Sequence, residues 1–177
     1  MRIISGRWRG RALIAPPGEG TRPTSDRARE AIFSMLASRL GTFEGLAVLD
    51  LFAGTGALGL EALSRGAASA CFVDNDAAAV RAIRVNLAAM GATGDVRQSP
   101  VSALGNTARA SHILFVDPPY DSGFAQPALA HLAERGWIAP GALVSVESAA
   151  GEALPTSWEL LVERRFGKAL VRLLRAP

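Results

Sequence analysis

The sequence predicts a single α/β domain of the doubly wound type, in which crossover helices join the strands of a mostly parallel sheet. Short runs rich in Val, Leu and Phe alternate with helical patterns along the chain. A length of 177 residues with 49% apolar and 20% charged residues suits one core rather than two. After Glu147 the alternation stops, and two strand-like runs follow with three residues between them. We therefore expect an antiparallel hairpin at one edge of the sheet.

Each element is predicted in chain order from its local pattern. Apolar runs predict parallel strands over 47–52, 69–74, 95–98, 112–117 and 142–147. The patterns between them are long enough for crossover helices over 57–65, 77–90 and 127–135. The hairpin strands are predicted over 158–166 and 170–174, on either side of Gly167-Lys168-Ala169.

Residues 1–40 differ in character from the core predicted over 41–177, and we treat them as an extension of the same domain. Segments 2–5 and 10–14 are predicted to pair as a small β-ribbon, with Arg7, Arg9 and Arg11 on one face of an extended strand. A proline- and glycine-rich loop follows. Thr24 or Ser25 then caps a helix whose core-facing side chains are expected to be Ala28, Ile32, Phe33, Met35 and Leu36.

Positive charge is concentrated at both ends of the chain. Seven arginines lie in residues 1–29 against Glu19 and Asp26, and five basic residues lie in 163–177 against Glu163 alone. Such clustering indicates a polyanionic partner, and a solvated surface that keeps the protein soluble is the open alternative. The candidate contacts at the N-terminal end are Arg7, Arg9, Arg11, Arg22, Arg27 and Arg29.

Composition excludes several classes of protein. Cys71 is the only cysteine and lies in an apolar run, so neither a disulfide framework nor a Cys/His zinc site is predicted. The two histidines, His112 and His131, have no metal-ligand or triad spacing, and we expect no metal. No segment approaches the roughly 18 apolar residues of a membrane helix, and residues 1–17 lack the apolar stretch of a signal peptide. We therefore expect a soluble, cytoplasmic protein.

A strand, a glycine-rich turn and a helix start are predicted from residues 48–59, VLDLFAGTGALG. The turn contains GxGxxG, and Asp74 ends the next strand 20 residues after Gly54, as in a dinucleotide-binding unit. Asp50 discriminates between ligands, because a carboxylate at the strand tip repels a pyrophosphate but attracts the ammonium and sulfonium groups of S-adenosylmethionine. The candidate cofactor-binding residues are Asp50, Phe52, Ala53, Gly54, Gly56 and Asp74.

The carboxylates of this motif also have a purely structural interpretation. Asp74 can accept hydrogen bonds from both ribose hydroxyls of a cofactor. In the alternative, Asp50 only caps the turn and Asp74 caps the following helix. Asp76 is the better-placed helix cap, which leaves Asp74 free for the ribose.

The second motif, residues 113–120 (ILFVDPPY), ends the fourth predicted strand. Two successive prolines stiffen the turn, so the Asp117 carboxylate and the Pro118 carbonyl can converge on one point. That point suits an amine donor such as the exocyclic amine of a nucleobase, whose ring Tyr120 can stack on. The candidate catalytic residues are Asp117, Pro118 and Tyr120; a stiffened loop with a stacking aromatic is the structural alternative.

The pair DLFAGTG and DPPY resembles the class I S-adenosylmethionine-dependent amino-methyltransferases. A narrower resemblance lies upstream, where GRWRGR (6–11) and RPTSDRAREAIFSML (22–36), together with FGKA (166–169), are similar to the RsmD family of bacterial 16S ribosomal RNA guanine-N2 methyltransferases. The resemblance covers essentially the whole chain. It implies a Rossmann-like seven-stranded sheet with the last strand antiparallel, S-adenosylmethionine as cofactor, and methyl transfer to N2 of one guanine.

The same resemblance implies a partner and two further residue roles. The partner is 16S ribosomal RNA, expected within a small-subunit particle and bound by a monomeric enzyme. Thr24 and Arg29 are implied to lie beside the cofactor or the target. Where such enzymes often place an acidic residue or Asn against the adenine amine, this chain has QSPV (98–101), and Ser99 is the nearest candidate.

Three rivals stay open at this point. An adenine-N6 DNA or RNA methyltransferase shares DPPY, but no segment of the chain is free to form a DNA target-recognition domain. A nicotinamide-dependent oxidoreductase is opposed by Asp50. A ribosome-assembly module with a vestigial cofactor site is opposed by the intact set of Asp50, Gly54, Gly56, Asp74 and Asp117.

Overall fold

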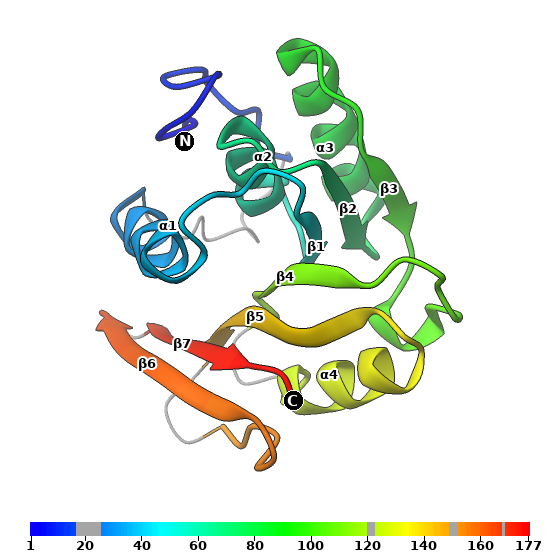
Figure 1. The fold of residues 1–177 in the computed structure, drawn as a ribbon. Coiled ribbons are helices and arrows are strands. Elements are labelled where there is room, and N and C mark those ends of the chain that lie inside the picture. Colours follow the sequence, from blue (N-terminus) through cyan, green and yellow to red (C-terminus); the bar gives the residue numbers. More distant parts are fainter. Residues whose placement is uncertain (17–25, 120–122, 149–151, 168) are drawn as a thin grey trace.

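The computed structural model describes residues 1–16, 26–119, 123–148, 152–167 and 169–177. Its centre is a seven-stranded sheet in the order β3-β2-β1-β4-β5-β7-β6 (Figure 1). The strands are β1 (Ala47–Leu51), β2 (Ser69–Asp74), β3 (Asp95–Gln98), β4 (Ser111–Val116), β5 (Ile138–Ser148), β6 (Glu159–Phe166) and β7 (Ala169–Arg175). β1 to β5 run parallel, and β7 is antiparallel to both β5 and β6. The predicted α/β fold with a hairpin at one edge is therefore confirmed.

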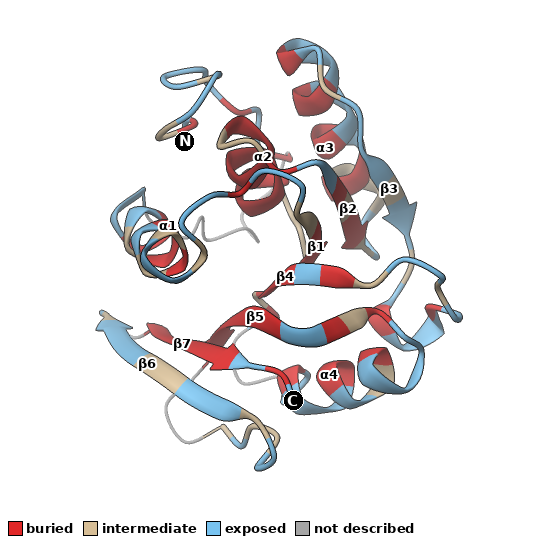
Figure 2. Ribbon diagram, viewed as in Figure 1, coloured by how far each residue is buried: buried red, intermediate tan, exposed pale blue. Residues whose placement is uncertain are grey.

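Helices cover both faces of the sheet, as Figure 1 shows. One face carries α1 (Asp26–Leu40), α2 (Ala57–Ser64) and α3 (Ala77–Met90), and the other carries α4 (Ala125–Glu134) and the short 3-10 helix η1 (Val101–Ala103). The central strands β1 and β4 are buried on both sides, which explains their nearly continuous apolar sequence (Figure 2). Among the described residues no helix is long and apolar enough to cross a membrane.

The strand β5 begins four residues before the predicted run of 142–147. Pro140 and Gly141 suggest a break in the sequence, but the backbone passes through them with a positive φ of 72° at Gly141. The pairing of Ser111 with Ile138 then shifts register before Ile113 pairs with Leu143. The early part of β5 is thus an irregular extension that periodicity does not predict.

The expected N-terminal ribbon is wrong in detail. A single antiparallel bridge joins Arg2 to Ala12, and the residues between them form turns with positive φ at Gly6 and Gly10. The three nearby arginines therefore do not share one face of an extended strand. Gly6 also approaches the end of α2 so closely that a Cβ would lie 2.0 Å from the Ser64 carbonyl oxygen.

Long-range hydrogen bonds hold this segment on the helices instead. The side chain of Glu61, fully buried in α2, accepts from the backbone N–H groups of Ile4 at 2.7 Å and Ser5 at 3.0 Å, and also from Arg65. Arg7 donates to the carbonyl of Leu63, and Arg11 donates to that of Ala89. Both carbonyls lie in the last turns of helices, where unpaired acceptors and the negative end of the helix dipole favour a cation.

The Glu61 contacts predict a specific loss of stability. Glu61→Gln replaces a charged acceptor by a neutral amide and should lower the free energy of unfolding by about 1.5–3 kcal/mol, the range for hydrogen bonds to a charged group. Denaturant unfolding measures this difference. Glu134→Gln, the same change at an exposed site on α4, is the control and should leave stability unchanged; equal stability of both variants would contradict the assigned role of Glu61.

Candidate active site

The strand order reverses between β1 and β4, and in sheets of this type ligands bind outside the carboxyl ends of the strands at that point. Asp50, Asp74 and Asp117 lie on the same side of the sheet as α1, α2 and α3. This follows from the alternation of neighbouring residues, because Val48, Phe72 and Phe115 belong to the core beneath those helices. The structure thus brings the three predicted carboxylates to one edge.

The glycine-rich turn between β1 and α2 has an unusual backbone. Phe52, Gly54 and Gly56 all have positive φ, at 55°, 56° and 75°. Phe52 is the only such residue among the described residues that is not glycine, and left-handed φ is uncommon in a bulky side chain. Farther on, Gly59 packs so closely on β2 that a Cβ would lie 2.3 Å from the Phe72 ring. The first and third glycines of GxGxxG therefore serve the turn and the helix-to-strand contact, respectively.

Asp50, on β1, stabilises the start of α2 directly after this turn. Its carboxylate is 1% exposed and accepts the N–H of Gly59 at 2.8 Å. Burial raises the pKa of Asp50 well above its usual value; the Gly59 hydrogen bond opposes this shift, and the charges of Asp117 and Asp74 add to it. The structure therefore shows the bracing role that the sequence left as an alternative, in a site where three carboxylates repel one another.

Asp74 contacts the turn from the neighbouring strand. One carboxylate oxygen accepts the N–H of Gly54 at 2.8 Å, and the other accepts the N–H of Asp76 at 2.9 Å. Asp76 itself caps α3 by accepting the N–H of Ala78, as predicted. The sequence suggested that Asp74 is free of protein contacts, but the structure shows two of them. A carboxylate has about four acceptor positions, so Asp74 can bind a ligand as well.

The remaining predicted site residues lie around the same edge. Asp117 and Pro118 directly follow β4, with the aspartate half-buried and the proline buried. Ser99 directly follows β3, where its backbone N–H donates to the carbonyl of Asp74 and its hydroxyl donates to that of Pro100. Ala53 joins the turn to β2 through its N–H and the carbonyl of Val73. Tyr120 and Thr24 lie outside the described residues.

The predicted basic residues separate into different environments. Arg29 is wrong as a surface contact for a polyanion, because it is 0% exposed and donates to Asp26 and to the carbonyl of Arg2. Burial lowers its pKa below the usual value, and Asp26 opposes that shift. Arg7 and Arg11 hold helix ends, as described above. Arg22 lies outside the described residues.

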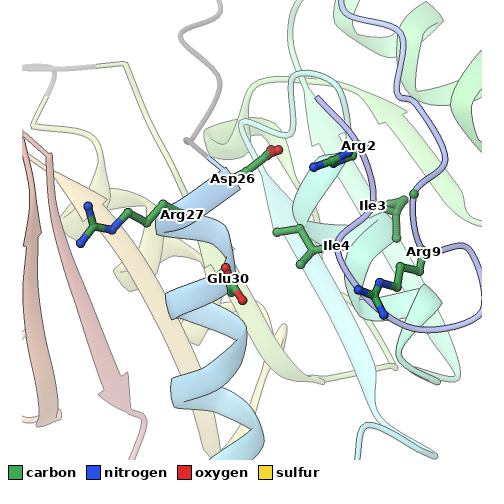
Figure 3. A pocket seen from close by; sticks show the side chains of 8 residues that line it. Arg2, Ile3, Ile4, Arg9, Asp26, Arg27 and Glu30 are labelled. Carbon is green, nitrogen blue, oxygen red and sulfur yellow. The ribbon is translucent and has the colours of Figure 1, made fainter.

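Arg9 and Arg27 are exposed and border a pocket of about 380 Å³ between α1 and the N-terminal segment (Figure 3). Arg2 and Arg9 extend from the N-terminal segment, whereas Asp26 and Glu30 extend from α1. The N-terminal wall is thus basic, whereas the α1 wall carries both signs of charge, with Arg27 beside Asp26 and Glu30. Among the described candidates, Arg29 is thus the one that is removed from the surface, whereas Arg7, Arg9, Arg11 and Arg27 stay exposed.

Two buried polar residues near the site were not predicted from the sequence. Asn86, 1% exposed in α3, donates to the carbonyls of Thr55 and Ile14 and accepts the N–H of Ile14. It therefore ties the glycine-rich turn to the N-terminal segment. The sequence does not indicate this role, because Asn86 lies among the apolar residues of a predicted helix and its partners Ile14 and Thr55 are far away in the chain. Glu147, at the end of β5, is the second such residue.

The chain matches the family model described as "Conserved hypothetical protein 95" over residues 1–175. It is 41% identical over 178 residues to "Ribosomal RNA small subunit methyltransferase D" of Escherichia coli (strain K12), covering 98% of this chain and 88% of that protein. The protein of the same description from Haemophilus influenzae is 36% identical over 181 residues, with 98% and 92% covered. A solved structure, "Putative methyltransferase yhhF from Escherichia coli", superposes with a TM-score of 0.88 at 40% identity, covering 99% of this chain and 97% of that one.

The raised pKa of Asp50 predicts a pH dependence of stability. An unfolded aspartate titrates near about pH 3.9. Above that pH the folded chain retains the proton that the unfolded chain has lost, so stability falls as pH rises toward the folded pKa of Asp50. Asp50→Asn keeps an acceptor for Gly59 without the charge. Its stability relative to wild type should therefore increase as pH rises from 4 to 8, as denaturant unfolding at several pH values measures; a constant or decreasing difference would contradict a raised pKa.

Proposed function

The chain belongs to the family described as conserved hypothetical protein 95, and we propose that it transfers a methyl group from S-adenosylmethionine to the exocyclic N2 of one guanine in 16S ribosomal RNA. The observation that carries this proposal is the convergence of Asp50, Asp74 and Asp117 beside a glycine-rich turn. The descriptions of the relatives from Escherichia coli and Haemophilus influenzae support small-subunit ribosomal RNA as the substrate. The choice of guanine and of its N2 atom rests on the resemblance to the RsmD family, because adenine-N6 methyltransferases share the DPPY turn.

The donor set of the crevice fits S-adenosylmethionine better than a dinucleotide. Burial raises the pKa of Asp50 and the charges of Asp117 and Asp74 add to this shift, so a bound ammonium or sulfonium would reduce the repulsion between the carboxylates. A pyrophosphate at the same place would increase it. The residues that would hold the cofactor are Asp50, Phe52, Ala53, Gly54, Gly56, Asp74 and Ser99, with the buried Asp50 acting through its hydrogen bond to Gly59 at the start of α2.

The cofactor supplies an electrophilic methyl group on a sulfonium. The chain's own residues prepare the acceptor. The Asp117 carboxylate and the Pro118 carbonyl would accept the two hydrogens of the guanine amine and so aim the nitrogen lone pair toward the donor. The proton that the methylated amine loses can pass to Asp117 or to water. Tyr120 would stack on the base, whose removal from its neighbours is easiest in an unpaired RNA segment.

We propose a monomer that works in the cytoplasm on RNA within a partly assembled small subunit. Arg9, Arg22 and Arg27 would contact the RNA backbone from the N-terminal side. Such contacts position the substrate, whereas the crevice selects the base.

The experiment that tests the proposal identifies the methylated nucleoside. The protein is incubated with methyl-labelled S-adenosylmethionine and with small subunits lacking the modification, naked 16S RNA or double-stranded DNA, and the products are digested. We expect label in N2-methylguanine from RNA. Label in N6-methyladenine, or in DNA and not in RNA, would overturn the proposal in favour of an adenine methyltransferase.

Two aspartate variants should separate turnover from cofactor binding. Asp117→Ala should abolish turnover and leave cofactor affinity nearly unchanged, because Asp117 is proposed to hold the target amine. Asp74→Ala should weaken cofactor binding by about 1.5–3 kcal/mol, since it removes an ionised acceptor. Calorimetry with S-adenosylhomocysteine and a single-turnover assay separate the two effects. Loss of cofactor affinity in Asp117→Ala, or unchanged affinity in a folded Asp74→Ala, would contradict the assignment.

Arg9 and Arg7 should differ in their effect on RNA binding. Arg9→Gln should lower RNA affinity and reduce the slope of log affinity against log salt by about 0.7–0.9, the value for one lost phosphate contact. Arg7→Gln should instead lower the thermal midpoint and leave the slope unchanged, because its guanidinium donates to Leu63. Filter binding at several salt concentrations measures both slopes. A wild-type slope in Arg9→Gln would show that Arg9 belongs only to a solvated surface.

A further inference from the structure

Glu147 lies beside the DPPY turn, on the strand next to β4. The register of the parallel pair runs from Phe115 opposite Ser145 to Val116 opposite Val146. One step farther, Asp117 and Glu147 are therefore neighbours across the carboxyl ends of β4 and β5. Adjacent strands lie about 4.8 Å apart. Two carboxylates thus border the position proposed for the target amine.

Both side chains lie on the same face of the sheet. Leu143, on that face of β5, belongs to the core beneath α1, whereas Val144 and Val146 belong to the core on the α4 side. By alternation Glu147 shares the face of Leu143 and of Asp117. Arg172 is on the opposite face, where it donates to the Ser148 hydroxyl and to the Glu152 carbonyl.

The side chain of Glu147 is largely shielded from solvent, with 9% exposure. A shielded carboxylate strongly favours a ligand that presents a hydrogen-bond donor and disfavours one that presents an acceptor. Guanine presents donors at both N1 and N2 on its Watson–Crick edge. Adenine presents an acceptor at N1 beside its N6 amine.

We propose that Glu147 is a specificity-determining residue that accepts the N1–H of the target guanine while Asp117 and Pro118 hold N2. This inference rests on the proposed function and goes beyond it, because it assigns the choice of guanine over adenine to β5 rather than to the DPPY motif. The proton stays on N1, so Glu147 orients and selects the base without taking part in the methyl transfer. Two neighbouring acceptors match two neighbouring donors on one edge of the base.

The test replaces the target guanine by 2-aminopurine in an RNA strand that is ligated into 16S RNA and assembled into small subunits. 2-Aminopurine keeps the N2 amine, but its N1 is an acceptor without hydrogen. Wild type should methylate it with a kcat/KM roughly 10- to 150-fold below that for guanine, the range for a lost hydrogen bond to a charged group. A wild-type enzyme that methylates both bases equally would overturn the inference.

The variant Glu147→Gln separates recognition by Glu147 from other effects of the base analogue. Its amide can donate to N1 of 2-aminopurine, so the ratio of guanine to 2-aminopurine methylation should fall at least about 10-fold from the wild-type ratio. Because 2-aminopurine also lacks O6, this change in ratio is the informative quantity. Glu134→Gln, the same substitution at an exposed site, should keep the wild-type ratio.

The outcomes distinguish the inference from the proposed function. If wild type labels no guanine in RNA, the proposed function fails. If wild type labels guanine and folded Glu147→Gln keeps the wild-type ratio, only the inference is overturned. A merely structural role of Glu147 would lower both rates together and leave the ratio unchanged. If Glu147→Gln does not fold, the ratio is measured instead in Glu147→Asp, whose shorter side chain withdraws the carboxylate from N1 and should likewise lower the ratio, and an unchanged ratio would overturn the inference.

Discussion

The turn between β1 and α2 is the constraint on which the rest of the structure depends. It must reverse the chain with three left-handed residues in five positions, and hydrogen bonds fix it from three directions. Asp50 holds the start of α2 from below, Asp74 holds the turn from the neighbouring strand, and Asn86 holds the carbonyl of Thr55 from α3. Because each contact comes from a different element, the turn keeps one conformation. Its backbone can then approach a ligand closely without rearranging.

The same contacts connect the cofactor crevice with the N-terminal segment. Asn86 bonds Ile14 as well as Thr55, and Glu61 on α2 holds the backbone of Ile4 and Ser5. The segment that carries the exposed arginines is therefore built on the helices that frame the crevice. An RNA bound there would approach the DPPY turn in a fixed orientation. In the proposed function, cofactor and substrate recognition thus share one framework.

Local pattern predicted the fold well, because periodicity in buried strands and crossover helices reflects packing on both faces of a sheet. The helix over 77–90 and the strands over 69–74 and 95–98 agree with the structure at both ends. The N-terminal ribbon failed because Glu61 and Asn86 hold that segment through contacts between residues far apart in the chain. The prediction that Arg29 contacts a polyanion was wrong because the charge of a residue does not show whether its side chain is buried. Glu147 was missed because only the register of β4 and β5 places it beside Asp117.

In the proposed function, the carboxyl groups of the crevice select a positively charged cofactor over a phosphorylated one. In the proposed function, a local arrangement that resembles a dinucleotide-binding unit takes a different ligand, because the carboxyl groups of Asp50 and Asp74 disfavour a pyrophosphate. The most direct test is calorimetric titration of the wild-type protein with S-adenosylhomocysteine and, separately, with NAD. The account predicts saturable binding of S-adenosylhomocysteine and no binding of NAD. Binding of NAD without binding of S-adenosylhomocysteine would contradict it.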